Sequence, residues 1–251
     1  MNIKNIIGIA SCKGGVGKST VSINIAASLA NHYNQKVGLL DADIYGPNHP
    51  SMLGIKNIQC NLNKNFFLPK KKFNLLSMSM GYFLKQNTSV LLRGPMVSNT
   101  IKYLLNNTAW GDLDFLIIDF PPGTGDIYLS LLRDIKFSGF FLVTTPQITS
   151  IDDMQKSICM LTKFNIKILG VLENMKYYYC CTCKTNNYLS SNTNDLLNCI
   201  NKFNIKNVYT LPVNKFINDS ANLGIPFVLN CSNNDLTVVF KNISKQILND
   251  V

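Results

Sequence analysis

The chain has 251 residues, of which 46% are hydrophobic, so it is long and apolar enough to bury one large core. Its formal net charge is +10, but the 22 Lys, 2 Arg and 33 Asn are scattered, so we expect no nucleic-acid interface, which requires clustered basic residues. The longest apolar runs are too short to cross a bilayer, and the N-terminus leads directly into a glycine-rich loop without room for a targeting peptide, so we expect no membrane partner.

Short apolar runs alternate with amphipathic segments from one end of the chain to the other. Residues 6–11 form an apolar run that stops at the glycine-rich loop, and residues 18–33 then place Val21, Ile25 and Leu29 on one helical stripe. Further apolar runs predict strands in 36–43, 73–81, 114–122, 139–147, 167–175 and 207–213. Further helical patterns occupy 126–135, 150–164, 214–224 and 235–250.

This alternation predicts the fold class. Continuous apolar strands separated by helices indicate an α/β domain with a mostly parallel sheet, doubly wound and covered by helices on both faces. Right-handed crossovers bring the C-terminal ends of the strands to one edge, where ligands bind. We expect a single domain over 1–251, in which the polar, Asn-rich segment 184–206 is a mobile insertion followed by a short helix.

The loop after the first strand has the chemistry of a phosphate-binding site. Its sequence, SCKGGVGKST at 11–20, departs from the pattern G-x-x-x-x-G-K-[ST] only at Cys12, which stands in place of the first glycine. The glycines allow backbone N–H groups to curl around phosphate oxygens, Lys18 would reach the β- and γ-phosphates, and the Ser19 hydroxyl would bind Mg²⁺. We expect ATP to contact Gly14, Gly15, Val16, Gly17, Lys18, Ser19 and Thr20.

Acidic residues follow two of the predicted strands. Asp41 and Asp43 close the second strand, and Asp119 closes an apolar strand that leads to two glycines, Gly123 and Gly125. An acid in such a place can orient an attacking water molecule or hold a Mg²⁺-bound water, although it can also be purely structural. The glycines would let the loop after Asp119 move when the γ-phosphate leaves.

The loop K-G-G-x-G-K-[ST], which begins at Lys13, resembles the deviant Walker A loop of the MinD/ParA/nitrogenase iron protein class of P-loop NTPases. In that class the early lysine reaches across a nucleotide-sandwich dimer to the partner's ATP, so the resemblance implies a homodimer and a catalytic role for Lys13 beside Lys18. It also implies that Asp43, the second acid of D-x-D, orients the attacking water, while Asp41 supports the Mg²⁺ shell or the loop. The segment FLIIDFPPGTGD looks like a Walker B motif with its switch.

Several stretches that ATP binding does not require follow a narrower pattern: DADIYGPNHPSMLG, RGPM and PPGTGD, together with residues 77–83, 143–147, 169–175 and 211–227. Taken in order from about residue 6 to residue 228, they resemble the Mrp-type (ApbC/Nbp-like) iron–sulfur cluster carrier ATPases. In the wider class the Asn of a motif like ENM contacts the adenine. The resemblance therefore assigns this contact to Asn174, with the Pro212 region as the other wall of the base pocket.

A few residues after ENM the sequence reads CCTC, which places Cys180 and Cys183 at C-x-x-C spacing. By spacing alone the pair could form half a zinc site or perform redox chemistry. The Mrp-type family has its cluster cysteines here, so the resemblance implies a [4Fe–4S] cluster. Two thiolates per chain cannot complete a four-cysteine set, whereas a homodimer with these cysteines at its two-fold axis can. We expect Cys181 not to be a ligand, although it could substitute for one.

The resemblance implies an ATP-dependent carrier, a homodimeric ATPase that works with cluster scaffold proteins and transfers a [4Fe–4S] cluster to apo-proteins. One alternative is a MinD- or ParA-like positioning ATPase without a cluster. MinD requires a C-terminal membrane helix, but 235–250 reads as a packing helix, and ParA requires a basic patch that the sequence lacks. Another alternative is a reductase like the nitrogenase iron protein, whose cluster cysteines lie far apart in sequence.

The remaining histidine and cysteine positions have simpler interpretations. We interpret His49 as a loop residue and not a ligand, and Cys159 as part of the core face of a helix. Cys60, Cys199 and Cys231 lack companions at ligand spacing and are interpreted as structural or incidental. We expect reduced thiols and a cytoplasmic location, or an organelle stroma or matrix if the protein is organellar.

Overall fold

The computed structural model describes residues 2–55, 62–63, 66–84, 94–123, 125–190 and 194–251. Within these residues eight strands form one sheet, in which only the edge strand β5 runs antiparallel to its neighbour. In spatial order the strands are β12 (Val208–Thr210), β9 (Ile168–Glu173), β8 (Gly139–Thr144), β1 (Asn2–Ala10), β7 (Asp112–Asp119), β2 (Val37–Asp41), β6 (Leu75–Ser79) and β5 (Lys70–Lys72). This arrangement confirms the predicted α/β class with a mostly parallel sheet.

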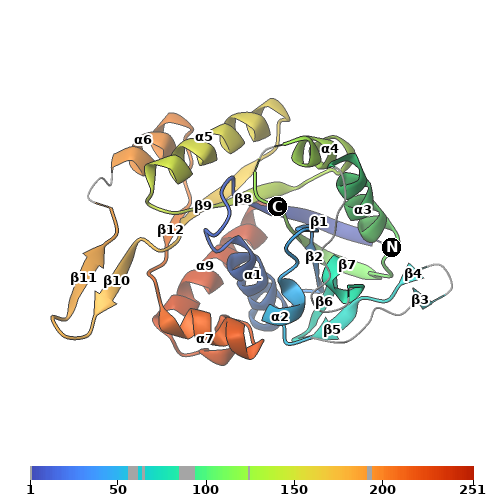
Figure 1. Cartoon of the computed structure of the whole chain (residues 1–251), viewed down its shortest axis with the longest axis horizontal. Helices are drawn as coiled ribbons and strands as arrows, with labels where there is room; N and C mark the ends of the chain where they lie inside the picture. The colour runs from blue at the N-terminus through green and yellow to red at the C-terminus, as the bar shows by residue number, and fades with distance from the viewer. Residues whose placement is uncertain (1, 56–61, 64–65, 85–93, 124, 191–193) are drawn as a thin grey trace.

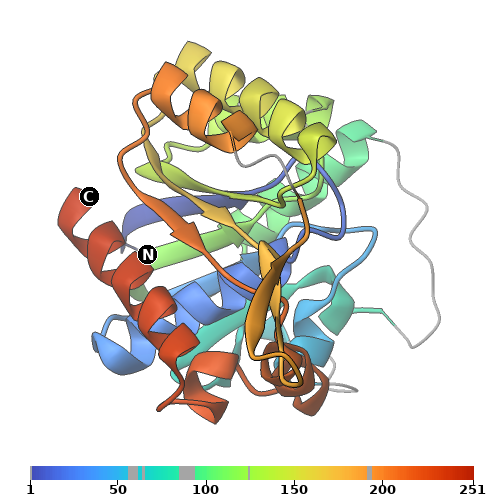
Figure 2. The same ribbon diagram turned by 90° about the vertical axis from the view of Figure 1, so that its left-hand side faces the viewer.

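Helices cover both faces of the sheet, as the doubly wound class requires (Figure 1). One face carries α3 (Gly94–Asn106), α4 (Asp126–Asp134), α5 (Ile148–Lys163) and α6 (Asn194–Lys202). The other side carries α1 (Lys18–His32), α2 (His49–Met52), α7 (Lys215–Leu223), α8 (Phe227–Asn230) and α9 (Asp235–Asp250). Figure 2, turned by 90°, shows the two helical layers with the sheet between them. Three shorter elements are β3 (Leu62–Asn63), β4 (Phe66–Phe67) and η1 (Met80–Tyr82).

In the core, α1 packs between the sheet and α9. The predicted stripe residues Val21, Ile25 and Leu29 are each at most 1% exposed, which confirms the helical periodicity of this segment. Phe240 and Ile243 of α9 are completely buried on the other side of α1. Truncating one such side chain to Ala costs about 2 to 5 kcal/mol in proteins generally, so this packing holds the start of α1 in place.

The final helix, α9, is a packing helix, as the sequence predicts. Asn234 caps its first turn, because the side-chain Oδ1 accepts the N–H of Leu236 at 3.0 Å. Its buried face contacts α1, β9 and β12. Across the part of the chain that the structure describes, none of the helices has the length and apolar character needed to span a bilayer.

The C-terminal ends of the parallel strands bring the predicted site together at one edge of the sheet. Asp41 and Asp119 are direct register partners at the ends of β2 and β7. Ser79, at the end of β6, is the register partner of Asp41 on its other side. Ile9 of β1 pairs with Asp119, so the glycine-rich loop that follows Ala10 begins beside these acids.

A two-stranded hairpin formed by β10 (Tyr177–Cys180) and β11 (Thr185–Tyr188) projects from the body, at the left of Figure 1. The rings of Tyr177 and Tyr188 pair across the strands with their centroids 5.6 Å apart. The hairpin is tied to the segment after β12, because the N–H of Val213 donates to the carbonyl oxygen of Tyr177 at 2.8 Å. The hairpin therefore has a fixed base and an exposed tip.

The described part of segment 184–206 contains strand β11 as well as α6. The sequence pattern predicts the short helix but no strand, because the Asn-rich composition resembles a loop. The strand forms because its residues pair with three consecutive tyrosines and Cys180 on β10. The mobility of the segment and the single-domain boundary of 1–251 remain predictions.

Candidate functional site

The loop between β1 and α1 is shaped by glycine. Gly15 and Gly17 have φ angles of 81° and 87°, a region that other residues adopt only with strain. Gly17 is the N-cap of α1 and has no side chain that could accept hydrogen bonds from the N–H groups of the first turn. A Cβ atom added to Gly14 or Gly15 would have no neighbouring atom within 4 Å, so the space beside these two residues is open. The loop therefore has the backbone and the room that an anion at a helix N-terminus requires.

Lys18 and Asp119 form a buried ion pair at the centre of the site. Lys18 Nζ lies 2.7 Å from Asp119 Oδ1, and the two side chains are 7% and 0% exposed. A phosphate that binds Lys18 has to compete with this carboxylate for the ammonium group. Ser19 follows Lys18 in the first turn of α1 and places a hydroxyl on the same helix.

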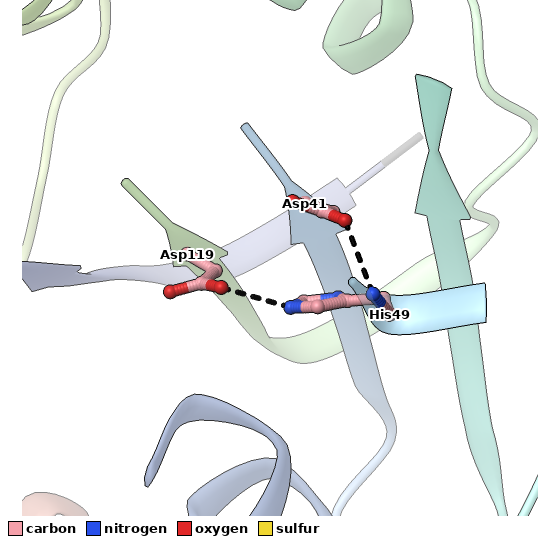
Figure 3. Close-up of side chains that lie close together, drawn as sticks. All are labelled: Asp41, His49 and Asp119. Atoms are coloured by element: carbon pink, nitrogen blue, oxygen red, sulfur yellow. Dashed lines mark hydrogen bonds and ion pairs between the residues drawn. The ribbon is translucent and has the colours of Figure 1, made fainter. Parts of the chain in front are cut away.

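Figure 3 shows that His49 lies between the two strand-end acids. His49 Nε2 is 3.0 Å from Asp119 Oδ2, and the backbone N–H of His49 donates to Asp41 Oδ2 at 3.3 Å. Asp41 also accepts the Ser79 hydroxyl at 2.9 Å and the N–H of Asp43 at 3.1 Å. The three side chains of Asp41, His49 and Asp119 are buried, at 1%, 0% and 0% exposure.

Burial and neighbouring charges shift the pKa values of the three residues in this cluster. Burial raises the pKa of Asp119, but the charge of Lys18 and the contact with His49 outweigh burial and hold that pKa well below its usual range. Burial lowers the pKa of His49, but Asp41 and Asp119 outweigh it and raise the pKa above its usual value. The pKa of Asp41 is raised, chiefly by burial. The carboxylate and hydroxyl oxygens of Asp119, Asp41 and Ser19 are hard ligands of the kind that Mg²⁺ prefers, so this donor set fits the ion.

Lys13 and Asp43 lie at the outer rim of the site. Lys13 Nζ donates to Gln147 Oε1 at 2.7 Å and to Thr149 Oγ1 at 3.2 Å, both in the segment that leads into α5. Asp43 is partly exposed, and its Oδ1 accepts the N–H of Gly46 at 3.1 Å. The structure thus brings Lys18, Asp119 and Asp41 together, whereas Lys13 contacts Gln147 and Thr149.

Asn174 and Pro212 line one pocket of about 300 Å³ beside the glycine-rich loop. Asn174 Nδ2 donates to the carbonyl oxygen of Val16 at 2.9 Å, which ties the end of β9 to the loop. A pocket of this size, with apolar walls and a few polar groups, suits a small ligand. Its lining residues include Gly17, Thr20, Val21, Met175, Leu211, Val213, Ile217 and Phe240. The two residues predicted for the adenine site therefore share a cavity, and their contact with adenine remains a prediction.

Cys180 and Cys183 lie at the exposed tip of the β10–β11 hairpin. Cys180 ends β10 and Cys183 lies in the turn, with Cys183 Sγ 2.9 Å from Thr185 Oγ1. Hydrogen bonds from Cys183, chiefly its backbone N–H, and from the N–H of Thr182 lower the pKa of the Cys180 thiol. The turn thus stabilises a thiolate at Cys180, which is the form that binds metal. Cys181, between them, is exposed.

The sequence profile of the family described as "ParA: NUBPL iron-transfer P-loop NTPase" matches residues 2–248. The chain belongs to this family. This NUBPL-type chain is 38% identical over 248 residues to the "iron-sulfur cluster carrier protein" of Helicobacter pylori, an alignment that covers 98% of this chain and 67% of that protein. It is 36% identical over 248 residues to the "iron-sulfur cluster transfer protein NUBPL" of Dictyostelium discoideum, covering 98% of this chain and 76% of that protein. The chain thus spans about two thirds to three quarters of the length of these relatives.

Two solved structures share the fold of this NUBPL-type chain. A nucleotide-binding protein from Archaeoglobus fulgidus, in complex with ADP, superposes with a TM-score of 0.78 at 31% identity, covering 90% of this chain and 88% of that protein. The cell division ATPase MinD from Pyrococcus furiosus superposes with a TM-score of 0.67 at 20% identity, covering 99% and 100%, and shows the fold alone. Together these findings confirm the predicted family and the predicted P-loop NTPase fold, and they identify a nucleotide-hydrolysing class of protein.

His49 and Cys159 lie in surroundings that differ from those predicted from the sequence. His49, interpreted as a loop residue, is the first residue of α2, is fully buried and contacts Asp119. No local pattern reveals this contact, because the partner lies 70 residues away and is brought near only by the pairing of β2 with β7. Cys159 is exposed because the buried stripe of α5 passes through Ile158 instead. Cys60 lies outside the described residues.

Proposed function

We propose that this chain is an ATP-dependent iron–sulfur cluster carrier that acts as a homodimer and transfers a [4Fe–4S] cluster to apo-proteins. The names of its NUBPL-type relatives support the carrier function and favour it over a positioning ATPase without a cluster. The observation that carries the proposal is the exposed C-x-x-C turn. It presents Cys180 and Cys183 to an outside partner. The lowered pKa of Cys180 favours its thiolate, which is the form that binds metal.

The cluster is the cargo, and each chain supplies half of its ligands. A [4Fe–4S] cluster takes four thiolates, whereas the hairpin tip offers Cys180 and Cys183. Two hairpins that meet at a two-fold axis would complete the set. Because the turn is exposed, a scaffold protein could deliver the cluster and an apo-protein could receive it without the body of the carrier unfolding.

The nucleotide would bind across the glycine-rich loop. Backbone N–H groups of this loop and Lys18 would hold the phosphates, while Asn174 and Pro212 would hold the base in the adjoining pocket. Ser19 would bind a Mg²⁺ ion, which would supply charge neutralisation on the phosphates, and Asp119 would hold a water molecule bound to that ion. For this to happen, Lys18 has to exchange its contact with Asp119 for one with phosphate oxygens.

Hydrolysis would use groups from two chains. Asp43 lies at the rim of the site, partly exposed, and would orient the attacking water. Lys13 would leave its contacts with Gln147 and Thr149 and reach the ATP of the partner chain, where it would neutralise charge on the transferred phosphoryl group. These contacts are exposed hydrogen bonds, so breaking them costs little.

The nucleotide pocket and the cysteine turn share one stretch of chain, which supports coupling between them. Asn174 follows β9 and bonds to the loop, and β10 begins at Tyr177, three residues later. The pocket wall continues into the hairpin, because the N–H of Lys176 donates to the carbonyl oxygen of Leu211 at 3.0 Å. A movement of the pocket wall on ATP binding would therefore be passed to the hairpin base.

Anaerobic reconstitution of the reduced protein with iron and sulfide tests the function. We expect about two irons per chain, a visible absorption band from thiolate-to-iron charge transfer and a native mass of a dimer. An apo-enzyme that requires a [4Fe–4S] cluster should regain activity when mixed with the loaded protein. A protein that binds one zinc tightly and never holds iron would exclude the carrier function.

A further inference from the structure

Both carboxylate oxygens of Asp119 have a partner, and the two partners differ in what they can do. Oδ1 accepts Lys18 Nζ at 2.7 Å, and Oδ2 contacts His49 Nε2 at 3.0 Å (Figure 3). Lys18 is the residue that the nucleotide would draw away. Among the described residues, His49 is then the remaining side-chain partner of Asp119.

His49 also closes the segment that carries the second acid of D-x-D. This segment begins at Asp41 and ends at His49, where the backbone N–H of His49 returns to Asp41 Oδ2 at 3.3 Å. Asp43 lies inside the closed segment, and its own N–H donates to Asp41 Oδ1 at 3.1 Å. One residue therefore contacts the acid at the end of β7 through its side chain and the acid at the end of β2 through its backbone.

We propose that His49 is a positioning residue of the ATPase site: it holds the Asp119 carboxylate in orientation while Lys18 moves to the nucleotide, and it fixes the Asp41–His49 segment that carries Asp43. This inference rests on the proposed ATPase mechanism. A carboxylate held at Oδ2 keeps Oδ1 directed toward the glycine-rich loop, where a Mg²⁺-bound water would be accepted.

A role in filling space alone does not explain why position 49 is a histidine. His49 Nδ1 is buried and has no hydrogen-bond partner within the described residues. An unsatisfied buried polar atom costs about 1 to 3 kcal/mol, and an apolar side chain of similar size would avoid that cost. The imidazole is therefore explained by the contact that its other nitrogen makes with Asp119.

Two substitutions at His49 and one at the second histidine test the proposal. His49→Leu fills the space without a donor, and His49→Gln keeps a side-chain N–H that can reach Asp119. His32→Leu is the matched control, since His32 is the other histidine and lies at the end of α1, near Ser28. For each variant we would measure thermal unfolding, the affinity for a fluorescent ATP analogue in EDTA and across a Mg²⁺ titration, and steady-state ATP hydrolysis.

We expect His49→Leu to lower kcat and to raise the Mg²⁺ concentration needed for half-maximal nucleotide binding, each by about 10- to 100-fold, as for loss of a partner that orients a metal-binding group. Affinity in EDTA should stay within about twofold, because Lys18 and the glycine-rich loop are intact. His49→Gln should recover most of the loss, and His32→Leu should behave as wild type. Cluster loading on Cys180 and Cys183 should be unchanged in all three variants.

Three results would overturn the proposal. His49→Leu could keep the wild-type kcat and Mg²⁺ dependence, or folded His49→Gln could lose as much as His49→Leu, which would make the shape of the ring decisive instead of its donor. His49→Leu could also lose affinity equally in EDTA, which would indicate a packing defect. If wild-type protein never holds iron, the carrier function fails, but the Mg²⁺ titration still decides the role of His49.

Discussion

Lys18 and Asp119 lie 101 residues apart in the sequence, yet Lys18 Nζ is 2.7 Å from Asp119 Oδ1 in a buried ion pair. The pair joins the first turn of α1 to the end of β7, so it connects the two segments that we propose to bind the nucleotide. Each charge compensates the other where both side chains are buried. If ATP binds Lys18 as proposed, it would therefore change the surroundings of Asp119 as well, and this exchange of partners is open to direct test.

Replacing Lys18 with Ala should abolish tight ATP binding, because it removes the charge that faces the β- and γ-phosphates. It also leaves the Asp119 carboxylate buried, with His49 as its remaining side-chain partner in the described part of the chain. The free energy of unfolding should therefore fall by about 3 kcal/mol. Nucleotide titration and urea unfolding measure the two effects. A double variant, Lys18→Met with Asp119→Asn, removes both charges and should regain much of the stability but none of the binding. Wild-type affinity in Lys18→Ala would refute the phosphate role of Lys18.

Replacing Lys13 with Ala should spare ATP binding and stability but reduce hydrolysis. The contacts of Lys13 with Gln147 and Thr149 are exposed and contribute little to folding. Its catalytic contribution would come from the charge it brings to the partner chain's ATP. Nucleotide titration and phosphate release distinguish binding from turnover, and equal losses in both would contradict the cross-dimer role.

Replacing Asp43 with Ala should leave a dimer that binds ATP and hydrolyses it very slowly. Asp43 is partly exposed, so the variant should remain close to wild type in stability. Asp41 is buried and accepts hydrogen bonds from Ser79, Asp43 and His49, so Asp41→Ala should instead destabilise the protein. Light scattering with ATP and single-turnover hydrolysis provide the measurements. An unchanged turnover rate in Asp43→Ala would transfer the role to another acid, with Asp41 next.

A mixture of Lys13→Ala and Asp43→Ala chains provides a sharper test of both roles. If Lys13 acts across the dimer and Asp43 acts within its own chain, a mixed dimer has one complete site. An equal mixture should then show about a quarter of wild-type activity, because half of the dimers are mixed and each has one site of two. If both residues act within one chain, no mixed dimer has a complete site and the mixture stays inactive.

Much of the fold was predictable because it follows from the hydrophobic periodicity of short segments. The strands and helices predicted in 36–43, 126–135 and 235–250 appear as β2, α4 and α9, with ends shifted by no more than two residues. Asp119 could be placed at the C-terminal edge of the sheet because it directly follows the apolar run FLII, although the predicted strand continued to residue 122 and β7 ends at Asp119. Such features depend on periodicity over a few residues, and no distant contact is needed to infer them.

The features that escaped prediction depend on contacts between distant segments. His49 follows a proline-containing loop, and its burial arises only when β2 and β7 pair and bring Asp119 beside it. Strand β11 has a loop-like composition and is formed by pairing with β10. Cys159 lies one residue from the buried Ile158, so a shift of one position around α5 moves it from the core to the surface.

The thiol of Cys180 should react with iodoacetamide at lower pH than that of Cys199. The N–H groups of the turn lower the pKa of Cys180 below its ordinary value of 9.0, whereas burial raises the pKa of Cys199 to about 11. Because the thiolate is the reactive form, a lowered pKa gives more thiolate at any pH below 9. Mass spectrometry of peptides from the metal-free, reduced protein, labelled between pH 6 and 10, measures the order. The same pH midpoint for both thiols would contradict the stabilisation of the Cys180 thiolate by the turn.

Replacing Cys180 or Cys183 with Ser should remove most of the reconstituted iron and weaken the dimer, while ATP still binds at Lys18. Each substitution removes two of the four thiolates that the dimer would contribute, and two remaining thiolates cannot hold a [4Fe–4S] cluster stably. Cys181→Ser is the matched control in the same turn, because it changes an exposed thiol by one atom and should keep about two irons per chain. Iron analysis, the visible absorption band and native mass under anaerobic conditions measure the outcome.

If Cys181→Ser loses the cluster while Cys180→Ser keeps it, the ligand is Cys181 and the carrier function survives. If all three variants and the wild type bind only zinc, the turn is a zinc site and the cluster assignment is wrong.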